Sequence, residues 1–353
     1  MGQLRELDAV DEATYAADEE AAAAAGVDLR GLRRPAALPF DTSRFTFREA
    51  VLACLDISSS GEDGSAVLEA LRVTAESARK LSKRTGNRGP STYYIQQWQT
   101  GMHGPSKRGG EFKKVYLDYL REVVLPHIGD PRGIVFQRDP TFRCHLAHGG
   151  EATGRRHNDS QYGHHRNELN FWLPITRAHA SNSLYSESRP GAQDFEPLEL
   201  EYGQCQRFWG AQCVHYTQPN ETEITRISLD FRVVPRSCYV QPDGGYNQFC
   251  LGRFFAALDA DGKLSYMGGA DAEEPRLSPG LTPVPAPVPL LCSQPGEPQG
   301  HEVRDAAGMA GGASPIQSEI KRRLLTQPYL LFTVLAVAMI AVHSGSRRPS
   351  WYC

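Results

Sequence analysis

The stretch RRHNDSQYGHH, from Arg155 to His165, concentrates side chains that can bind a metal ion. His157 and Asp159 are two residues apart, and on a strand such residues point to the same face. One imidazole and one carboxylate can then reach one ion, and His215 in GAQCVHYTQPN is the best-placed third ligand. A His, Asp, His set is the facial triad of non-haem Fe(II) oxygenases, which leaves positions open for O2 and a co-substrate. We therefore predict iron ligation by these three residues.

Each of the three ligands also has a simpler interpretation. An HxD pair occurs by chance in many chains, so His157 and Asp159 are also consistent with a solvated polar loop. His215 alone is also consistent with a buried histidine that is hydrogen-bonded in a protein core. Cys205 and Cys213 flank His215, and we interpret them as small buried side chains rather than as thiolate ligands.

A second pattern, TRISLDF, begins ten residues after His215 and strengthens the metal interpretation. Arg226, Ser228 and Asp230 share one face of the strand that this alternation predicts. An arginine inside a barrel needs an anionic partner, because an unpaired buried charge is costly. Its planar fork fits a carboxylate, and a nearby hydroxyl can add a bond to the same group. We therefore predict that Arg226 and Ser228 hold the distal carboxylate of 2-oxoglutarate.

Other polar residues near these motifs are weaker candidates. His145, which alternates with Arg143, and Asn170 are candidate contacts of the co-substrate, although Asn170 could equally cap a strand end. His164 and His165 could orient a ligand or lie in solvent. Arg155 and Arg156 fit either an anionic substrate or a solvated loop, and Arg232 we interpret as structural.

The elements that must position these residues follow from hydrophobic periodicity. A helical pattern extends from about Phe45 to Leu81, and a clearer one in EFKKVYLDYLREVVLPHI should end at Pro126. Its apolar face comprises Phe112, Val115, Tyr116, Tyr119, Leu120 and Val123. After it the period changes to two, with turn signals at short intervals. The candidate strands are GIVFQRD, FRCHLAH, NELNFWLPI, SNSLYSES, FEPLELEYG, QCQRFWG and TRISLDFRVV. Many short strands without intervening helices favour a sandwich, jelly roll or barrel.

Composition shifts divide the chain. Residues 1–44 are predicted to be an acidic, Ala-rich arm, 45–134 a helical region that packs on the barrel, and 135–240 the β core. Residues 241–320 are rich in Gly and Pro and predict a linker. Within 321–353, residues 324–346 contain no Asp, Glu, Lys or Arg and are just long enough to span a membrane. We expect either a membrane anchor or a peripheral helix there.

Charge and cysteine content limit the remaining possibilities. The net charge of −3 does not mark the chain as a nucleic-acid-binding protein. Its eight cysteines contain no CxxC pair and indicate reduced thiols. With no N-terminal signal peptide recognisable, we expect a cytoplasmic-facing protein, anchored if 324–346 spans the membrane. The sequence leaves the oligomeric state open.

The run His157, Asp159, Ser160, Tyr162, Gly163, His164, followed by Glu168, Asn170, Phe171, Trp172, Leu173 and Pro174, resembles the StrG-type proteins of streptomycin biosynthesis. These are similar to Fe(II)/2-oxoglutarate-dependent oxygenases, and the resemblance covers about residues 135–235. It implies a double-stranded β-helix (jelly roll, cupin-like), iron at His157, Asp159 and His215, and 2-oxoglutarate on Arg226. The basic residues before His157 and the C-terminal extension depart from the pattern.

The leading hypothesis is therefore an Fe(II)- and 2-oxoglutarate-dependent dioxygenase. It would use O2 to hydroxylate or oxidatively cyclise a C–H bond of a polar small molecule, such as a sugar or cyclitol, and release succinate and CO2. The alternatives are a non-catalytic metal-binding β-barrel and a membrane-tethered scaffold. The sequence does not identify the substrate or the outcome of the reaction.

Overall fold

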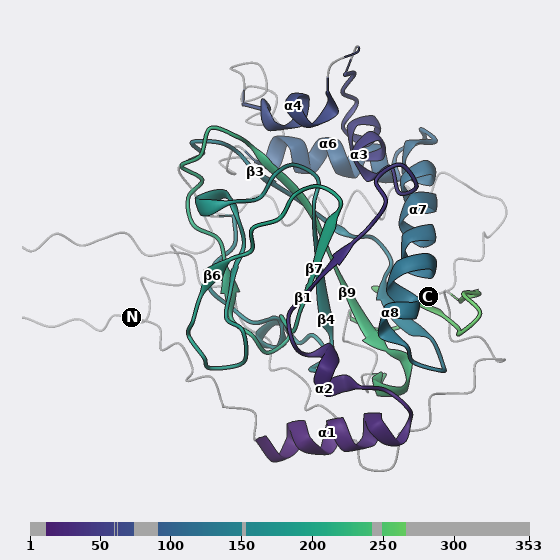
Figure 1. Cartoon of the computed structure of the whole chain (residues 1–353). Coiled ribbons are helices and arrows are strands. Elements are labelled where there is room, and N and C mark those ends of the chain that lie inside the picture. Colours follow the sequence, from purple (N-terminus) through teal and green to yellow (C-terminus); the bar gives the residue numbers. More distant parts are fainter. Residues whose placement is uncertain are drawn as a thin grey trace, which may run out of the picture. The chain divides into compact units, whose positions relative to one another are not determined.

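Two antiparallel sheets form the centre of the fold (Figure 1). The computed structural model describes residues 12–59, 61, 63–73, 91–149, 153–241 and 249–265. Its α-helices are α1 (Glu12–Ala24), α2 (Leu29–Leu32), α3 (Phe47–Leu55), α4 (Gly64–Glu69), α6 (Thr92–His103), α7 (Arg108–Tyr119) and α8 (Leu125–Ile128). Its strands are β1 (Ala36–Pro39), β2 (Ile134–Gln137), β3 (Thr141–His145), β4 (Leu169–Pro174), β5 (Tyr185–Ser186), β6 (Glu196–Pro197), β7 (Gln204–Phe208), β8 (His215–Tyr216), β9 (Arg226–Pro235), β10 (Phe255–Leu258) and β11 (Leu264–Ser265).

Strand β9 organises the larger sheet, whose order is β1-β7-β4-β9-β2-β10-β11. One edge of β9 pairs with β4 along most of its length. The other edge pairs first with β3 and then with β2. The smaller sheet has the order β6-β5-β8 and carries His215 at the start of β8.

The two faces of β9 have different neighbours, as alternation requires. On one face, Phe231 stacks on Phe171 of β4 and meets the ring of Tyr116 of α7 edge-on, with 5.2 Å between ring centroids in each pair. Helices α3, α6 and α7 lie on this side of the sheet, and the sheet containing β6 lies on the other (Figure 1). A larger and a smaller antiparallel sheet with flanking helices confirm the predicted fold class, a double-stranded β-helix core.

The predicted helices form, but they end at other residues than those we predicted. The pattern over Phe45–Leu81 yields two short helices, because α3 ends at Asp56, which has φ 58°, and α4 starts anew at Gly64. Residues 74–90 lie outside the described part. Pro126 does not end the next helix, which continues through a π-helical turn, Leu120–Val124, and then α8 to Gly129 at φ 68°. The wider turn shifts the register, so that Val124 is buried and Val123 only partly so.

The N-terminal segment is not a separate arm over its described part, which begins at Glu12. Strand β1 pairs with β7 at the edge of the larger sheet. Asp18 and Ala22 of α1 are buried. Asp18 pairs with the buried Arg33 and with the partly buried Arg166, which is 148 residues away in the sequence. The exact domain boundaries remain predictions.

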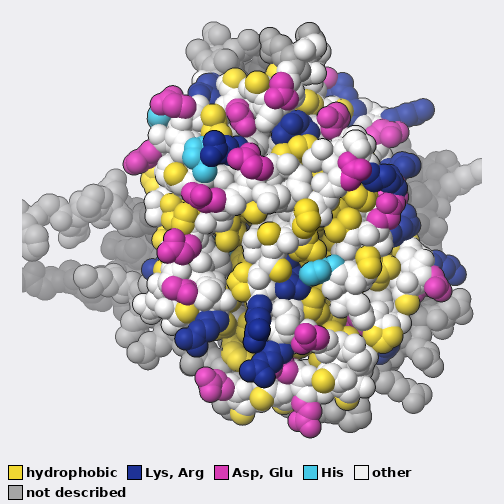
Figure 2. Space-filling view, viewed as in Figure 1, with side chains coloured by type: hydrophobic (Ala, Val, Ile, Leu, Met, Phe, Trp, Pro, Cys, Tyr) yellow, Lys and Arg dark blue, Asp and Glu magenta, His cyan; other side chains and the backbone are white. Residues whose placement is uncertain are grey.

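Strands also continue beyond Pro235, where we expected them to stop. Strand β10 pairs with β2, and β11 pairs with β10, so part of the predicted linker 241–320 belongs to the sheet. Residues 266–353 lie outside the described part, and with them the predicted anchor at 324–346. Among the described residues, the helices are too short or too polar to cross a membrane. Basic and acidic side chains are interspersed over the face shown in Figure 2.

Candidate metal centre and active site

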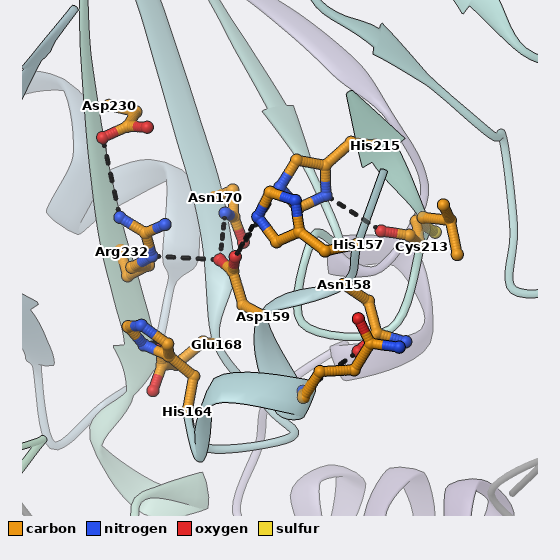
Figure 3. A network of polar contacts seen from close by, with 12 residues as sticks. His157, Asn158, Asp159, His164, Glu168, Asn170, Cys213, His215, Asp230 and Arg232 are labelled. Carbon is orange, nitrogen blue, oxygen red and sulfur yellow. Dashed lines mark hydrogen bonds and ion pairs between the residues drawn. The ribbon is translucent and has the colours of Figure 1, made fainter. Parts of the chain in front are cut away.

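His157, Asp159 and His215 come together at one point of the barrel (Figure 3). One ligand atom from each lies within 4.8 Å of the others. The Nε2 atoms of His157 and His215 are each 3.6 Å from Oδ1 of Asp159. The predicted triad is therefore present, with its donor atoms facing one another.

The local backbone differs from the strand that the two-residue spacing suggested. His157 forms an isolated bridge with His215 rather than part of a strand. Asp159 begins a 3-10 turn, Asp159–Tyr162, with Asn158 as its N-cap. The backbone N–H of Asp159 donates to the carbonyl of Gly210, close in sequence to His215. Hydrogen bonds between the two loops therefore bring the ligands together, and strand alternation does not.

Both histidines are held in the tautomer that a metal requires. Nδ1 of His215 is 3.0 Å from the carbonyl of Cys213, and Nδ1 of His157 contacts the carbonyl of Arg155. A carbonyl can only accept, so each Nδ1 carries the proton. The lone pair of each ring then lies on Nε2, the atom that faces Asp159.

The two carboxylate oxygens of Asp159 also have different partners. Its Oδ2 accepts from Nδ2 of Asn170 at 2.7 Å and from Nε of Arg232 at 3.0 Å, while Oδ1 faces the two imidazoles. Asn170 and Arg232 are paired directly across β4 and β9. Asn170, which we predict to contact the co-substrate, and Arg232, which we interpreted as structural, thus both orient the candidate metal ligand. In the sequence, Arg232 shares one strand face with Arg226, which placed it inside the barrel. The sequence did not show that Asp159 lies beside it.

The surroundings favour the protonation states in which Asp159 and His215 can bind a cation. Burial would raise the pKa of Asp159, but Arg232 and the neighbouring His157 and His215 hold it well below its usual range. Burial lowers the pKa of His215, so that its imidazole is neutral near pH 7. Burial would lower the pKa of Arg232, but Asp159 and Asp230 raise it, so it stays charged.

Arg226 is fully buried, and its hydrogen-bond partners are uncharged. Nε donates to the carbonyl of Asn182 at 2.9 Å, Nη1 donates to Oγ of Ser228 at 2.8 Å, and Nη2 lies 3.3 Å from Nδ1 of His145. Burial lowers its pKa to about 10, with a contribution from the charge of Arg143, so it is still protonated. Among the described side chains, no carboxylate is within ion-pair distance of Arg226.

One cavity joins the metal ligands to Arg226. Its volume is about 60 Å³. Trp172, Phe208 and Leu184 form its apolar walls, and Arg143, Asp230 and Arg232 line its polar side. Its lining therefore includes both candidate metal ligands, His157 and His215, and the buried guanidinium of Arg226. The roles that we assign to His145, Asn170, Arg226 and Ser228 in co-substrate binding remain predictions.

The remaining polar candidates have other roles. His164 and His165 are buried, so the solvated interpretation was wrong. Nδ1 of His164 is 2.7 Å from Glu168, and burial lowers the pKa of His165 to about 4. Arg156 is exposed and lies over the ring of Phe195.

The cysteines beside the metal ligands behave as small apolar side chains. Cys205 and Cys213 are buried with free thiols, and burial raises the pKa of the Cys205 thiol to about 12. The triad contains two imidazoles and one carboxylate, without a thiolate.

The donor set fits Fe(II). Imidazole suits iron as well as other divalent metals, and a carboxylate adds one negative charge to a site that leaves positions open. His157, Asp159 and His215 each have one atom fixed by a hydrogen-bond partner and a second atom free to coordinate. The class defined by fold and site is a double-stranded β-helix protein with a His-Asp-His centre.

Some known proteins resemble this chain in sequence or in structure. No family model matches the chain. Over 124 residues the chain is similar to the streptomycin biosynthesis protein StrG of Streptomyces griseus, with 41% identity. The match includes 35% of this chain and spans 58% of the length of StrG.

Similar solved structures include two non-haem enzymes. One is the non-haem monooxygenase ThoJ in complex with Ni, at 16% identity and a TM-score of 0.38, covering 74% of this chain and 89% of ThoJ. Another is the non-haem alpha-ketoglutarate-dependent epimerase SnoN of nogalamycin biosynthesis, at 13% identity and a TM-score of 0.30, covering 63% and 84%.

Proposed function

We propose that this chain is an Fe(II)- and 2-oxoglutarate-dependent oxygenase that acts on a polar small molecule. The observation that carries the proposal is the convergence of Nε2 of His157, Nε2 of His215 and Oδ1 of Asp159, with the second polar atom of each side chain already engaged. Fixing one polar atom of each side chain by a hydrogen bond costs conformational freedom. That cost is explained if an ion binds between the three remaining atoms.

Arg226 supplies the second part of the argument. A buried guanidinium without a carboxylate partner is costly, and breaking a buried pair typically destabilises a protein by about 3–5 kcal/mol. The distal carboxylate of 2-oxoglutarate, bound by Arg226 and Ser228 inside the cavity, would supply the missing charge. A barrel that only binds metal has no need for such an arginine in the same cavity.

The chain's own residues would bind the iron, orient its ligands and exclude water from the cavity. His157, Asp159 and His215 would hold the iron, and Arg232 and Asn170 would keep one carboxylate oxygen turned toward it. When bound, iron and 2-oxoglutarate would use O2 to oxidise a C–H bond of the substrate with release of succinate and CO2. Trp172 and Phe208 would exclude water and confine the substrate to the cavity.

The substrate class rests on similarity. The matched region relates the chain to a protein of streptomycin biosynthesis, which supports a hydroxylated small molecule such as a sugar or cyclitol. The charged lining of the cavity also favours a polar substrate over a lipid. Hydroxylation, desaturation and ring closure would all be compatible with the same residues.

The proposal is tested by adding Fe(II) and then 2-oxoglutarate to the anaerobic protein and recording its visible spectrum. We expect a charge-transfer band from the chelated co-substrate, and slow succinate release after air is admitted. His157→Ala should lose the band. Arg226→Gln should keep iron binding but require far more 2-oxoglutarate.

A matched control is Arg177→Gln, because Arg177 is exposed and paired with Glu201 away from the cavity. This variant should behave like the unmodified protein. If the protein binds iron but shows neither the band nor succinate, the non-catalytic metal-binding alternative replaces the oxygenase.

A further inference from the structure

Arg143 is the one arginine of the cavity that is both charged and half-exposed. The exposed fraction of its side chain is 40%, against 8% for Arg232, and Arg226 is buried. It lies on β3 opposite Ser228, so its side chain shares the inner face with Arg226 and Asp230. In the described part of the chain its hydrogen bonds go to a single atom, Oδ2 of Asp230, from Nε at 3.3 Å and from Nη2 at 3.2 Å. Its Nη1 is left for another partner.

Arg143 ends a row of alternating charges that starts at the metal ligand. Asp159 accepts from Arg232, and Nη1 of Arg232 lies 3.6 Å from Oδ1 of Asp230 (Figure 3). Asp230 in turn accepts from Arg143. Each inner member has neighbours of opposite charge on both sides. Arg143 has such a neighbour on one side only, and its other side faces the cavity.

A count of charges gives the same result, and it rests on the proposed function. Three arginines (143, 226 and 232) and two aspartates (159 and 230) leave one positive charge along the cavity. Fe(II) adds two positive charges and 2-oxoglutarate adds two negative ones, so one positive charge remains after both have bound. Arg226 would be paired with one carboxylate of the co-substrate, and Asp159 and the other carboxylate would face the iron. The remaining positive charge is then shared by Arg143 and Arg232 around Asp230, and Arg143 is the more exposed of the two.

We propose that Arg143 binds an anionic group of the substrate, a carboxylate or a phosphate, and so selects acidic or phosphorylated derivatives of hydroxylated small molecules over neutral ones. The planar guanidinium can present two N–H groups to such an anion while Asp230 keeps it in place. Arg156 is exposed next to His157, and its guanidinium lies 5.9 Å from the ring centroid of Tyr216, which lines the cavity.

The test follows the side-chain Nε–Hε resonance of Arg143 by NMR in full-length protein labelled on arginine Nε. Arg143→Lys identifies the resonance. The protein is first loaded with Zn(II) and saturating 2-oxoglutarate, and each binding step is verified by calorimetry. Inorganic phosphate, acetate and neutral myo-inositol are then titrated as probes. We expect saturable shifts with phosphate or acetate, whichever the site prefers, and none with myo-inositol.

A binding measurement gives the magnitude. Arg143→Gln should weaken binding of the effective anion about tenfold or more, whereas Arg177→Gln should not. The affinity for 2-oxoglutarate should be nearly unchanged in Arg143→Gln, in contrast to Arg226→Gln.

The outcomes separate the two proposals. If Zn(II) or 2-oxoglutarate does not bind, the proposed function fails. If both bind and Arg143 does not respond to either anion, the present inference is overturned and the function stands. It is also overturned if Arg143→Gln loses 2-oxoglutarate as strongly as Arg226→Gln, because Arg143 then belongs to the co-substrate site.

Discussion

At the scale of single residues, the candidate site depends on which atom of each side chain is already engaged. Asp159 has one oxygen bound by Asn170 and Arg232 and one facing the histidines. Asn170 is itself tightly packed, because a Cβ at Gly210 would come within 2.5 Å of its Cγ. Gly210 therefore acts on the metal site through Asn170.

Gly210→Ala should displace Asn170 and weaken metal binding by about tenfold or more, as loss of outer hydrogen bonds typically does. Titration of the apoprotein with Co(II) or Ni(II) by calorimetry measures this. Gly110→Ala is the matched control, since nothing lies within 4 Å of its added Cβ on α7. That control should leave metal affinity unchanged and raise stability by roughly 0.5 kcal/mol. Equal affinity in both variants would contradict the role of Asn170.

At the scale of elements, helix α1 holds both loops that carry metal ligands. Asp18 accepts from Nε and Nη2 of Arg166 at 2.7 Å each, close to the loop of Asp159. Tyr15 donates to Gln212 at 2.9 Å, and Gln212 donates to Oγ of Ser160 at 2.7 Å. The N-terminal segment that the sequence presented as an arm thus stabilises the surroundings of the site.

Asp18→Asn should lower the free energy of unfolding by about 3 kcal/mol, because it leaves Arg166 without its carboxylate and Arg33 with Glu19 alone. Chemical denaturation measures the loss, and hydrogen exchange should quicken in residues 157–167. Glu19→Gln serves as the control, since Glu19 is more exposed and has one bond, to Arg33. We expect a change below about 1 kcal/mol for it. Similar losses in both variants would argue against a specific role of Asp18.

Buried histidines of the same loop region predict a pH dependence. Burial lowers the pKa of His165 from 6.5 to about 4, so the unfolded chain binds more protons than the folded protein between these values. Stability is therefore complete above pH 6.5 and falls as the pH drops toward 4, by on the order of 3 kcal/mol. Denaturation curves over this range measure the slope, and His165→Gln should reduce it. An unchanged slope in that variant would assign the loss to other groups.

At the scale of the whole molecule, the metal ligands connect separate parts of the barrel. His157 and Asp159 lie in the loop before β4, and His215 lies in the smaller sheet. An ion bound by all three would bind the folded chain and not the unfolded one. Folding and metal binding should therefore be linked.

Metal at 100 times its dissociation constant should stabilise the protein by about 2.7 kcal/mol and raise Tm accordingly. Thermal denaturation with Co(II), and again after removal with EDTA, measures the shift. The double variant His157→Ala/Asp159→Ala should show no such shift. A shift that persists in this variant would place the ion elsewhere.

The sequence by itself determined the residue types, the period of two and the helical face, because these depend on neighbours a few residues apart. It therefore indicated β9, β4, the three ligands and Arg226. Only the tertiary structure decided that a 3-10 turn presents Asp159, that Arg232 and Asn170 engage its second oxygen, and that α1 and β10 join the fold. Arg232 and Asp159 are 73 residues apart, and α1 contacts a loop 148 residues away. Contacts at such separations depend on how the whole chain folds back on itself, which no local pattern encodes.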